Sequence, residues 1–187
     1  MAQRHANGQL ATDISIQDPK ARVQAYIDLY RRNGIDEEPF DSLLMRTIRV
    51  TTARTCDLVT EGMAAQCTFE LEVLSQFCNR MGNMHGGCVA LLADMSTTMT
   101  TAPVAKEGFW VFGGVSRTLN VTYLQPVKQG AVLEIECMLR SIGKRLSTTQ
   151  CLIREKRTGK LLAMGEHGKS ALSDQQMGQS PPGASKL

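Results

Sequence analysis

The stretch NRMGNMHGGCVALLAD, Asn79–Asp94, decides the fold expected of this chain. In it, His85, Gly86 and Gly87 precede an apolar run, a pattern typical of a helix that begins at Gly86. The first backbone N–H groups of a helix have no partner within it, and glycine leaves them open to a ligand. An oxygen that becomes negative during acyl transfer could bind there. The stretch therefore predicts a helix whose N-terminus holds an oxyanion.

A rotation of about 100° per residue divides this helix into two faces. The small, polar face is predicted to hold Gly87, Ala90, Asp94, Thr97 and Thr98. The other face is apolar and is predicted to pack on a sheet through Cys88, Leu91, Leu92, Met95 and Met99. Asp94 is the only ionisable group on the polar face, and aspartate is a poor residue for a helix interior. Taken alone, the glycines could also serve close packing, and Asp94 could simply face solvent.

The combined spacing Asn79-x-x-Gly82-x-x-His85-Gly86-Gly87-x-x-Ala90-x-x-x-Asp94 resembles the signature of hotdog-fold acyl-CoA thioesterases. The resemblance is to the branch of the phenylacetate-pathway enzymes and thioesterase superfamily member two. It continues through Gly114–Gly130, Gly143–Leu146 and Thr158–Ser170, and so covers about residues 40 to 172.

The resemblance implies an α+β hotdog fold, with an antiparallel sheet of five or six strands wrapped around a long central helix. Strand patterns occur at 46–52, 64–74, 111–124, 131–140, 146–156 and 160–172, with a turn at 57–63 between the first two. A single domain is expected over residues 18–172, beginning with a helix at 18–34 and a short helix near 40–45. Residues 1–17 and 173–187 are expected to be disordered tails.

By the same resemblance, the Gly86 N–H and the Asn79 side chain would hold the thioester carbonyl, and His85 would help to set the loop. Asp94 from the opposite protomer would activate water or attack directly, assisted by Ser116 on the next strand. A homodimer is then the minimum assembly, and a homotetramer is expected.

Coenzyme A would enter as part of the substrate, and no resident cofactor is expected. The positions that match the coenzyme A-binding segments of similar enzymes are Tyr123, Leu124, Gln125, Pro126, Val127, Lys128, Ser141, Ile142, Gly143, Lys144, Arg145, Leu146 and Ser170. Among them, Lys128, Lys144 and Arg145 are candidates for the phosphates, although a basic residue in a turn is usually just solvated. Phe109, Trp110 and Phe112 could line an acyl tunnel or could equally belong to the core.

Two other functions stay open. One is an enoyl-thioester hydratase or dehydratase on the same fold, which would pair a histidine with a carboxylate in a differently spelled motif. The other is a non-catalytic protein that binds acyl-CoA, against which an intact Asp94 argues.

Composition excludes several other classes. With 187 residues and 42% hydrophobic content, the chain suits one domain with a real core, and no apolar run approaches the length of a membrane span. A net charge of +3 without a basic, aromatic-rich run makes nucleic acid an improbable partner. Six scattered cysteines are expected to be reduced core residues, and three histidines without ligand spacing predict no metal site.

The chain ends in Ser185, Lys186 and Leu187, the tripeptide read by the peroxisomal import receptor. A peroxisomal location is therefore expected, with a cytosolic one if the tripeptide is not read. A peroxisomal address in turn favours a medium- or long-chain fatty acyl-CoA as the substrate.

Overall fold

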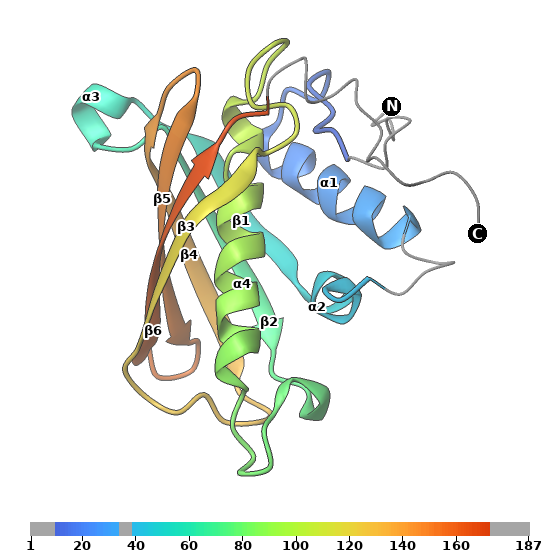
Figure 1. Cartoon of the computed structure of the whole chain (residues 1–187), viewed down its shortest axis with the longest axis vertical. Coiled ribbons are helices and arrows are strands. Elements are labelled where there is room, and N and C mark those ends of the chain that lie inside the picture. Colours follow the sequence, from blue (N-terminus) through green and yellow to red (C-terminus); the bar gives the residue numbers. More distant parts are fainter. Residues whose placement is uncertain (1–9, 34–38, 173–187) are drawn as a thin grey trace.

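A computed structural model describes residues 10–33 and 39–172 of the chain. A six-stranded antiparallel sheet curves around one long helix, α4 (Gly86–Met99), which runs along its inner face (Figure 1). The strand order is β1-β2-β4-β5-β6-β3. The strands are β1 (Arg49–Thr55), β2 (Ala65–Glu72), β3 (Val115–Tyr123), β4 (Val132–Ile142), β5 (Leu146–Glu155) and β6 (Leu161–Ser170). The α+β hotdog architecture expected from the sequence is therefore confirmed.

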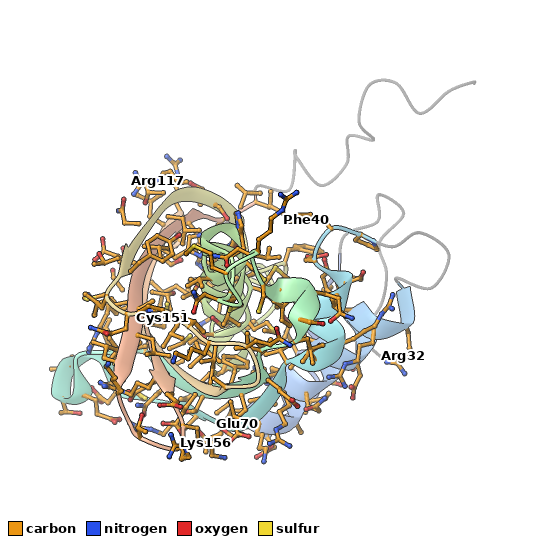
Figure 2. All side chains as sticks on the ribbon, turned by 90° about the horizontal axis from the view of Figure 1, so that it is seen from below. Arg32, Phe40, Glu70, Arg117, Cys151 and Lys156 are labelled. Carbon is orange, nitrogen blue, oxygen red and sulfur yellow. The ribbon has the colours of Figure 1, made fainter. Side chains whose placement is uncertain are left out.

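Helix α4 lies very close to the sheet because small residues meet at their contact. A Cβ atom added at Gly165 of β6 would come within 3.5 Å of the Ala93 Cβ atom and 3.0 Å of the Cys151 sulfur. Ala93 and Ser96 are fully buried on the helix side of this contact. Figure 2, which looks along α4, shows the strands curving around the helix, with Cys151 inside the curve.

The prediction of which α4 residues face the sheet was partly wrong. Leu92 and Met99 are buried, as predicted. The rest of the sheet-facing surface consists of Val89, Ala93 and Ser96, whereas Cys88, Leu91 and Met95 are only partly buried. The prediction followed hydropathy, but a helix packed this closely to a sheet needs small side chains at the contact.

Helices α1 (Pro19–Asn33) and α2 (Ser42–Thr47) pack beside the sheet next to β1. Their apolar side chains join the core through Val23, Ile27, Leu44 and Met45. The buried Arg22 fixes α1 to the segment after α4, because its Nη1 donates to the carbonyls of Ala102, Pro103 and Ala105 at 3.2, 3.1 and 3.1 Å.

Two other regions near the start of the sheet differ from the sequence predictions. The first strand begins at Arg49 rather than residue 46, because α2 continues to Thr47. The predicted turn at 57–63 contains the one-turn helix α3 (Leu58–Glu61), capped by Asp57, whose carboxylate accepts the N–H groups of Val59 and Thr60. Short 3-10 turns occur at Ser75–Phe77 and Ala102–Val104.

Part of the segment 1–17, which was expected to be a disordered tail, packs against the domain. Ala11 and Thr12 are buried, and the Thr12 N–H donates to the Val111 carbonyl at 2.8 Å. The predictions of a tail over residues 1–9, a C-terminal tail over 173–187 and a targeting tripeptide at Ser185, Lys186 and Leu187 concern residues outside the described part of the chain.

Two further findings concern the described part of the chain. None of its helices is long and apolar enough to cross a membrane. Its six cysteines are all free, and it contains no cluster of three or more histidine, cysteine or acidic side chains that could hold a metal ion.

Candidate active site

The first backbone N–H groups of α4 are mostly bonded to the cap residue before it. His85 is the N-cap residue, and its Nδ1 accepts the Gly87 N–H at 3.0 Å. The Cys88 N–H donates to the His85 carbonyl at 2.8 Å. Within residues 10–33 and 39–172, the Gly86 N–H has no acceptor, so it is the donor that remains for a ligand. Gly86 is held in place from the other side, where the Tyr123 hydroxyl donates to its carbonyl at 3.0 Å.

The Asn79 side chain belongs to the loop just before this helix. Its Oδ1 accepts the N–H groups of Met81 at 2.9 Å and Asn83 at 3.3 Å, so the oxygen is used to fold the loop. These two donors also fix which end of the amide is oxygen. The amide NH₂ group has no acceptor in the described part of the chain. Asn79 therefore keeps an amide donor that the loop does not use.

Asp94 lies about two helical turns beyond Gly86, on the same helix. Its side chain is 31% exposed, which leaves it open to water or substrate. The Ser116 hydroxyl of β3 lies 3.3 Å from Asp94 Oδ2, and the Thr98 hydroxyl lies 3.3 Å from Asp94 Oδ1. The structure thus brings Asp94 and Ser116 of one chain together.

Two buried residues of β6, His167 and Lys169, lie near the Asp94 carboxylate, and neither was predicted from the sequence. His167 of β6 is fully buried, and its Nε2 lies 4.0 Å from Asp94 Oδ1. Lys169 of β6 is only 2% exposed, and its Nζ donates to the Thr98 hydroxyl oxygen at 2.9 Å. Their signal in the sequence is two ionisable residues at alternate positions of one strand, which places both on one face of the sheet.

Burial changes the titration of both groups. It lowers the pKa of His167 to about 4, helped by the positive charge of Lys169 and opposed by the negative charge of Asp94. It lowers the pKa of Lys169 to about 8, again opposed by Asp94. His167 is therefore neutral at neutral pH, while Lys169 is still mostly charged.

The segments expected to bind coenzyme A fall into two groups. Tyr123–Lys128 lies beside the Asn79 loop, because the Met84 N–H donates to the Val127 carbonyl at 2.7 Å and Lys128 forms a β-bridge with Asn83. Ser141–Leu146 and Ser170 lie together at the other end, where Leu146 pairs with Ser170. Figure 1 shows the loop after β3 and the turn between β4 and β5 at opposite ends of the sheet. The nine residues of β3 separate the ends by about 26 Å, at about 3.3 Å per residue.

The aromatic residues before β3 are partly core and partly cavity wall. Trp110 is buried, and its indole N–H donates to the Gly143 carbonyl at 2.7 Å. Phe109, Trp110 and Phe112 nevertheless line a cavity of about 270 Å³, together with Lys144.

The hotdog sheet, the Gly86 N–H left without an acceptor among the described residues and the carboxylate two turns along are the features expected of hotdog-fold thioesterases. The Thioesterase superfamily model matches residues 81–161. Mouse acyl-coenzyme A thioesterase 13 is 35% identical over 100 residues, which cover 54% of this chain and 69% of that protein. The chain belongs to the thioesterase superfamily.

Two other comparisons agree. A candidate esterase of Caenorhabditis elegans is 37% identical over 106 residues, and the match spans 57% of this chain and 60% of the worm protein. The crystal structure of zebrafish thioesterase superfamily member 2 superposes with a TM-score of 0.66 at 27% identity, covering 80% of this chain and 98% of that one.

Proposed function

We propose that this protein hydrolyses the thioester of an acyl-coenzyme A to a free acid and coenzyme A. The observation that carries the proposal is the Gly86 N–H at the start of α4, which has no acceptor within residues 10–33 and 39–172, just as the amide NH₂ of Asn79 has none there. The name of the mouse relative supports acyl-coenzyme A as the substrate class.

A complete site needs two copies of the chain. Gly86 and Asp94 are separated by about 12 Å along α4, at about 1.5 Å per residue, which is too far for both to reach one carbonyl group. The functional residues of one protomer form two groups, with Asn79, Gly86 and Tyr123–Lys128 at one end and Asp94, Ser116, Ser141–Leu146 and Ser170 toward the other. A two-fold axis would place the Asn79 and Gly86 group of each protomer next to the Asp94 group of its partner, which gives two complete sites per dimer.

Strand β3 is the surface that such a dimer would use. It forms the edge of the sheet next to β6, and most of its residues are exposed, including Ser116. An exposed edge strand of nine residues is a ready template for pairing with a second copy. We therefore include a homodimer in the proposal, and a homotetramer built from two such dimers.

In this arrangement the Gly86 N–H and the Asn79 amide would bind the thioester oxygen, which becomes negative as water attacks. The Asp94 carboxylate of the second copy would accept a proton from that water, with Ser116 orienting it. The tetrahedral intermediate would then collapse by breaking the carbon–sulfur bond and releasing the coenzyme A thiolate. Lys128 near one end and Lys144 and Arg145 near the other would face the phosphates.

The acyl group is proposed to be a medium- or long-chain fatty acyl group, which would place the protein in lipid metabolism. The aromatic cavity beside Lys144 and the peroxisomal tripeptide at residues 185–187 support this choice.

The test is release of free thiol from hexanoyl-, palmitoyl- and phenylacetyl-coenzyme A by the purified chain. We expect hydrolysis, and we expect Asp94→Asn to lower the rate about a hundredfold or more while ligand binding persists. A variant with wild-type turnover would refute the role of Asp94, and release from none of the thioesters would refute the function.

One observation favours the second candidate, an enoyl-thioester hydratase. His167 and Asp94 place a histidine and a carboxylate 4.0 Å apart, which is the acid–base pair that hydration would use. Loss of enoyl absorbance from an enoyl-coenzyme A, without thiol release, would favour this candidate over hydrolysis.

A further inference from the structure

The ammonium group of Lys169 is buried without a negatively charged group in direct contact among the described residues. Its side chain is 2% exposed, and the one described hydrogen-bond acceptor is the neutral hydroxyl of Thr98. None of the ion pairs in the described part of the chain includes Lys169. Burying an ammonium group without a counter-ion in contact is strongly unfavourable. A lysine at this position therefore calls for a functional reason.

The Thr98 hydroxyl connects Lys169 to Asp94, the proposed catalytic carboxylate. Because Lys169 donates to the oxygen of Thr98, the hydrogen of that hydroxyl is turned toward Asp94, whose backbone carbonyl lies at 2.8 Å and whose Oδ1 lies at 3.3 Å. The Thr98 hydroxyl thus lies between the positive charge of Lys169 and Asp94.

The hydrogen bonds of His167 determine which of its nitrogens carries the proton. The Thr97 hydroxyl lies 2.6 Å from the Ala93 carbonyl and must donate there, because a carbonyl cannot donate. Its oxygen, 2.6 Å from His167 Nδ1, therefore accepts the Nδ1–H. His167 Nε2 is left as a lone pair that faces Asp94, and it has no hydrogen-bond partner in the described part of the chain.

A lone pair facing a carboxylate is an unstable arrangement without a nearby positive charge. A proton on Nε2 would form an ion pair with Asp94 and remove the base from the site. The charged groups that face this cluster are Asp94 from α4 and Lys169 from β6. Arg117 of β3 lies on the other face, beside the space where a Gly168 side chain would stand, and β5 offers only threonines opposite His167 and Gly168.

We propose that Lys169 is a positioning residue whose charge, placed behind Thr98, keeps His167 neutral, so that Asp94 is the base of the site. This inference rests on the proposed thioester hydrolysis. The low pKa of His167 and its opposite dependence on Lys169 and Asp94 agree with this division of charge.

The first experiment measures charge without using activity. Lys169→Met keeps the length of the side chain and removes the charge. NMR titration of the imidazole resonances should then show His167 titrating about one pH unit higher than in the wild-type protein. Lys20→Met, at an exposed lysine of α1, is the control and should leave His167 unchanged. A folded Lys169→Met protein with an unmoved His167 would overturn the proposal, whether or not the protein is a thioesterase.

The second experiment measures the pH dependence of turnover. Its main comparison uses Lys169→Arg, so it can be carried out even if Lys169→Met does not fold. If acyl-coenzyme A is hydrolysed, the wild-type rate should fall as Lys169 loses its proton near pH 8, and Lys169→Arg, which stays charged, should lack this alkaline decline. The acidic limb of Lys169→Met should move to higher pH. Identical pH profiles in all folded variants would show that Lys169 is only structural.

Discussion

The imidazole Nδ1 of His85 accepts the N–H of Gly87 at 3.0 Å, and this single bond decides which donor of α4 is free. By occupying the second N–H of the helix, His85 leaves the first, that of Gly86, for substrate. His85 is therefore a cap that shapes the proposed oxyanion site, and this role does not require it to exchange protons.

This relationship predicts how His85 can be replaced. Asparagine is also a good N-cap, so His85→Asn should keep most of the stability and turnover. His85→Ala should lower the free energy of unfolding by about 1 kcal/mol and should also slow turnover. Urea unfolding and thiol-release assays on both variants measure the two effects. If His85→Asn were as inactive as a catalytic-base variant, the histidine would have to act chemically.

The separation of Gly86 from Asp94 predicts complementation between two inactive variants. Asn79→Ala and Asp94→Asn should each be nearly inactive, the former by about 3 kcal/mol in transition-state stabilisation. Mixed and reassembled, they should form heterodimers of the proposed kind, in which one of the two sites is intact. Activity should then recover to about one quarter of the wild-type value, since half of the dimers are mixed.

The control for this experiment is each variant unfolded and reassembled alone, which should regain nothing. A mixture that stays inactive while native mass spectrometry detects heterodimers would place the whole site within one protomer. An active monomer in light scattering would do the same.

The local parts of this site could be predicted from the sequence. Asn79, His85 and Gly86 lie in one loop and one helix N-terminus, so the family resemblance of this short stretch is enough to propose them together. His167 and Lys169 could not be linked to Asp94, because only the pairing of β6 in the sheet brings them under α4. The buried face of α4 was misjudged for a similar reason, since Ala93 and Ser96 are small residues whose importance depends on Gly165 of another element.

The bonds of Arg22 predict a large loss of stability far from the site. Arg22→Met would leave three buried carbonyls, those of Ala102, Pro103 and Ala105, without this donor. We expect the free energy of unfolding to fall by about 3 kcal/mol. Arg32→Met, at an exposed position of the same helix, should change it by less than about 0.5 kcal/mol. Equal losses in urea unfolding of the two variants would contradict the structural role of Arg22.

The buried state of His167 predicts a stability change in mild acid. Its pKa is about 4 in the folded protein and 6.5 without the fold, so between these values the unfolded chain binds more protons. The free energy of unfolding should therefore fall as the pH decreases from 6.5 to 4. His167→Gln cannot titrate and should show a shallower slope over this window. Parallel slopes for the two proteins would mean that His167 is solvated and not held neutral.

The terminal tripeptide predicts the location of the protein, and this prediction depends on Ser185, Lys186 and Leu187 alone. A fluorescent protein fused to the N-terminus leaves the tripeptide accessible to the import receptor, so the fusion should collect in peroxisomes. Fusion at the C-terminus masks the tripeptide, and deletion removes it, so both should leave the protein in the cytosol. The deletion variant should keep thiol-release activity, because the proposed site residues all precede residue 173. Peroxisomal fluorescence from the deletion variant would show that the tripeptide is coincidental, and it would remove the main argument for a fatty acyl substrate.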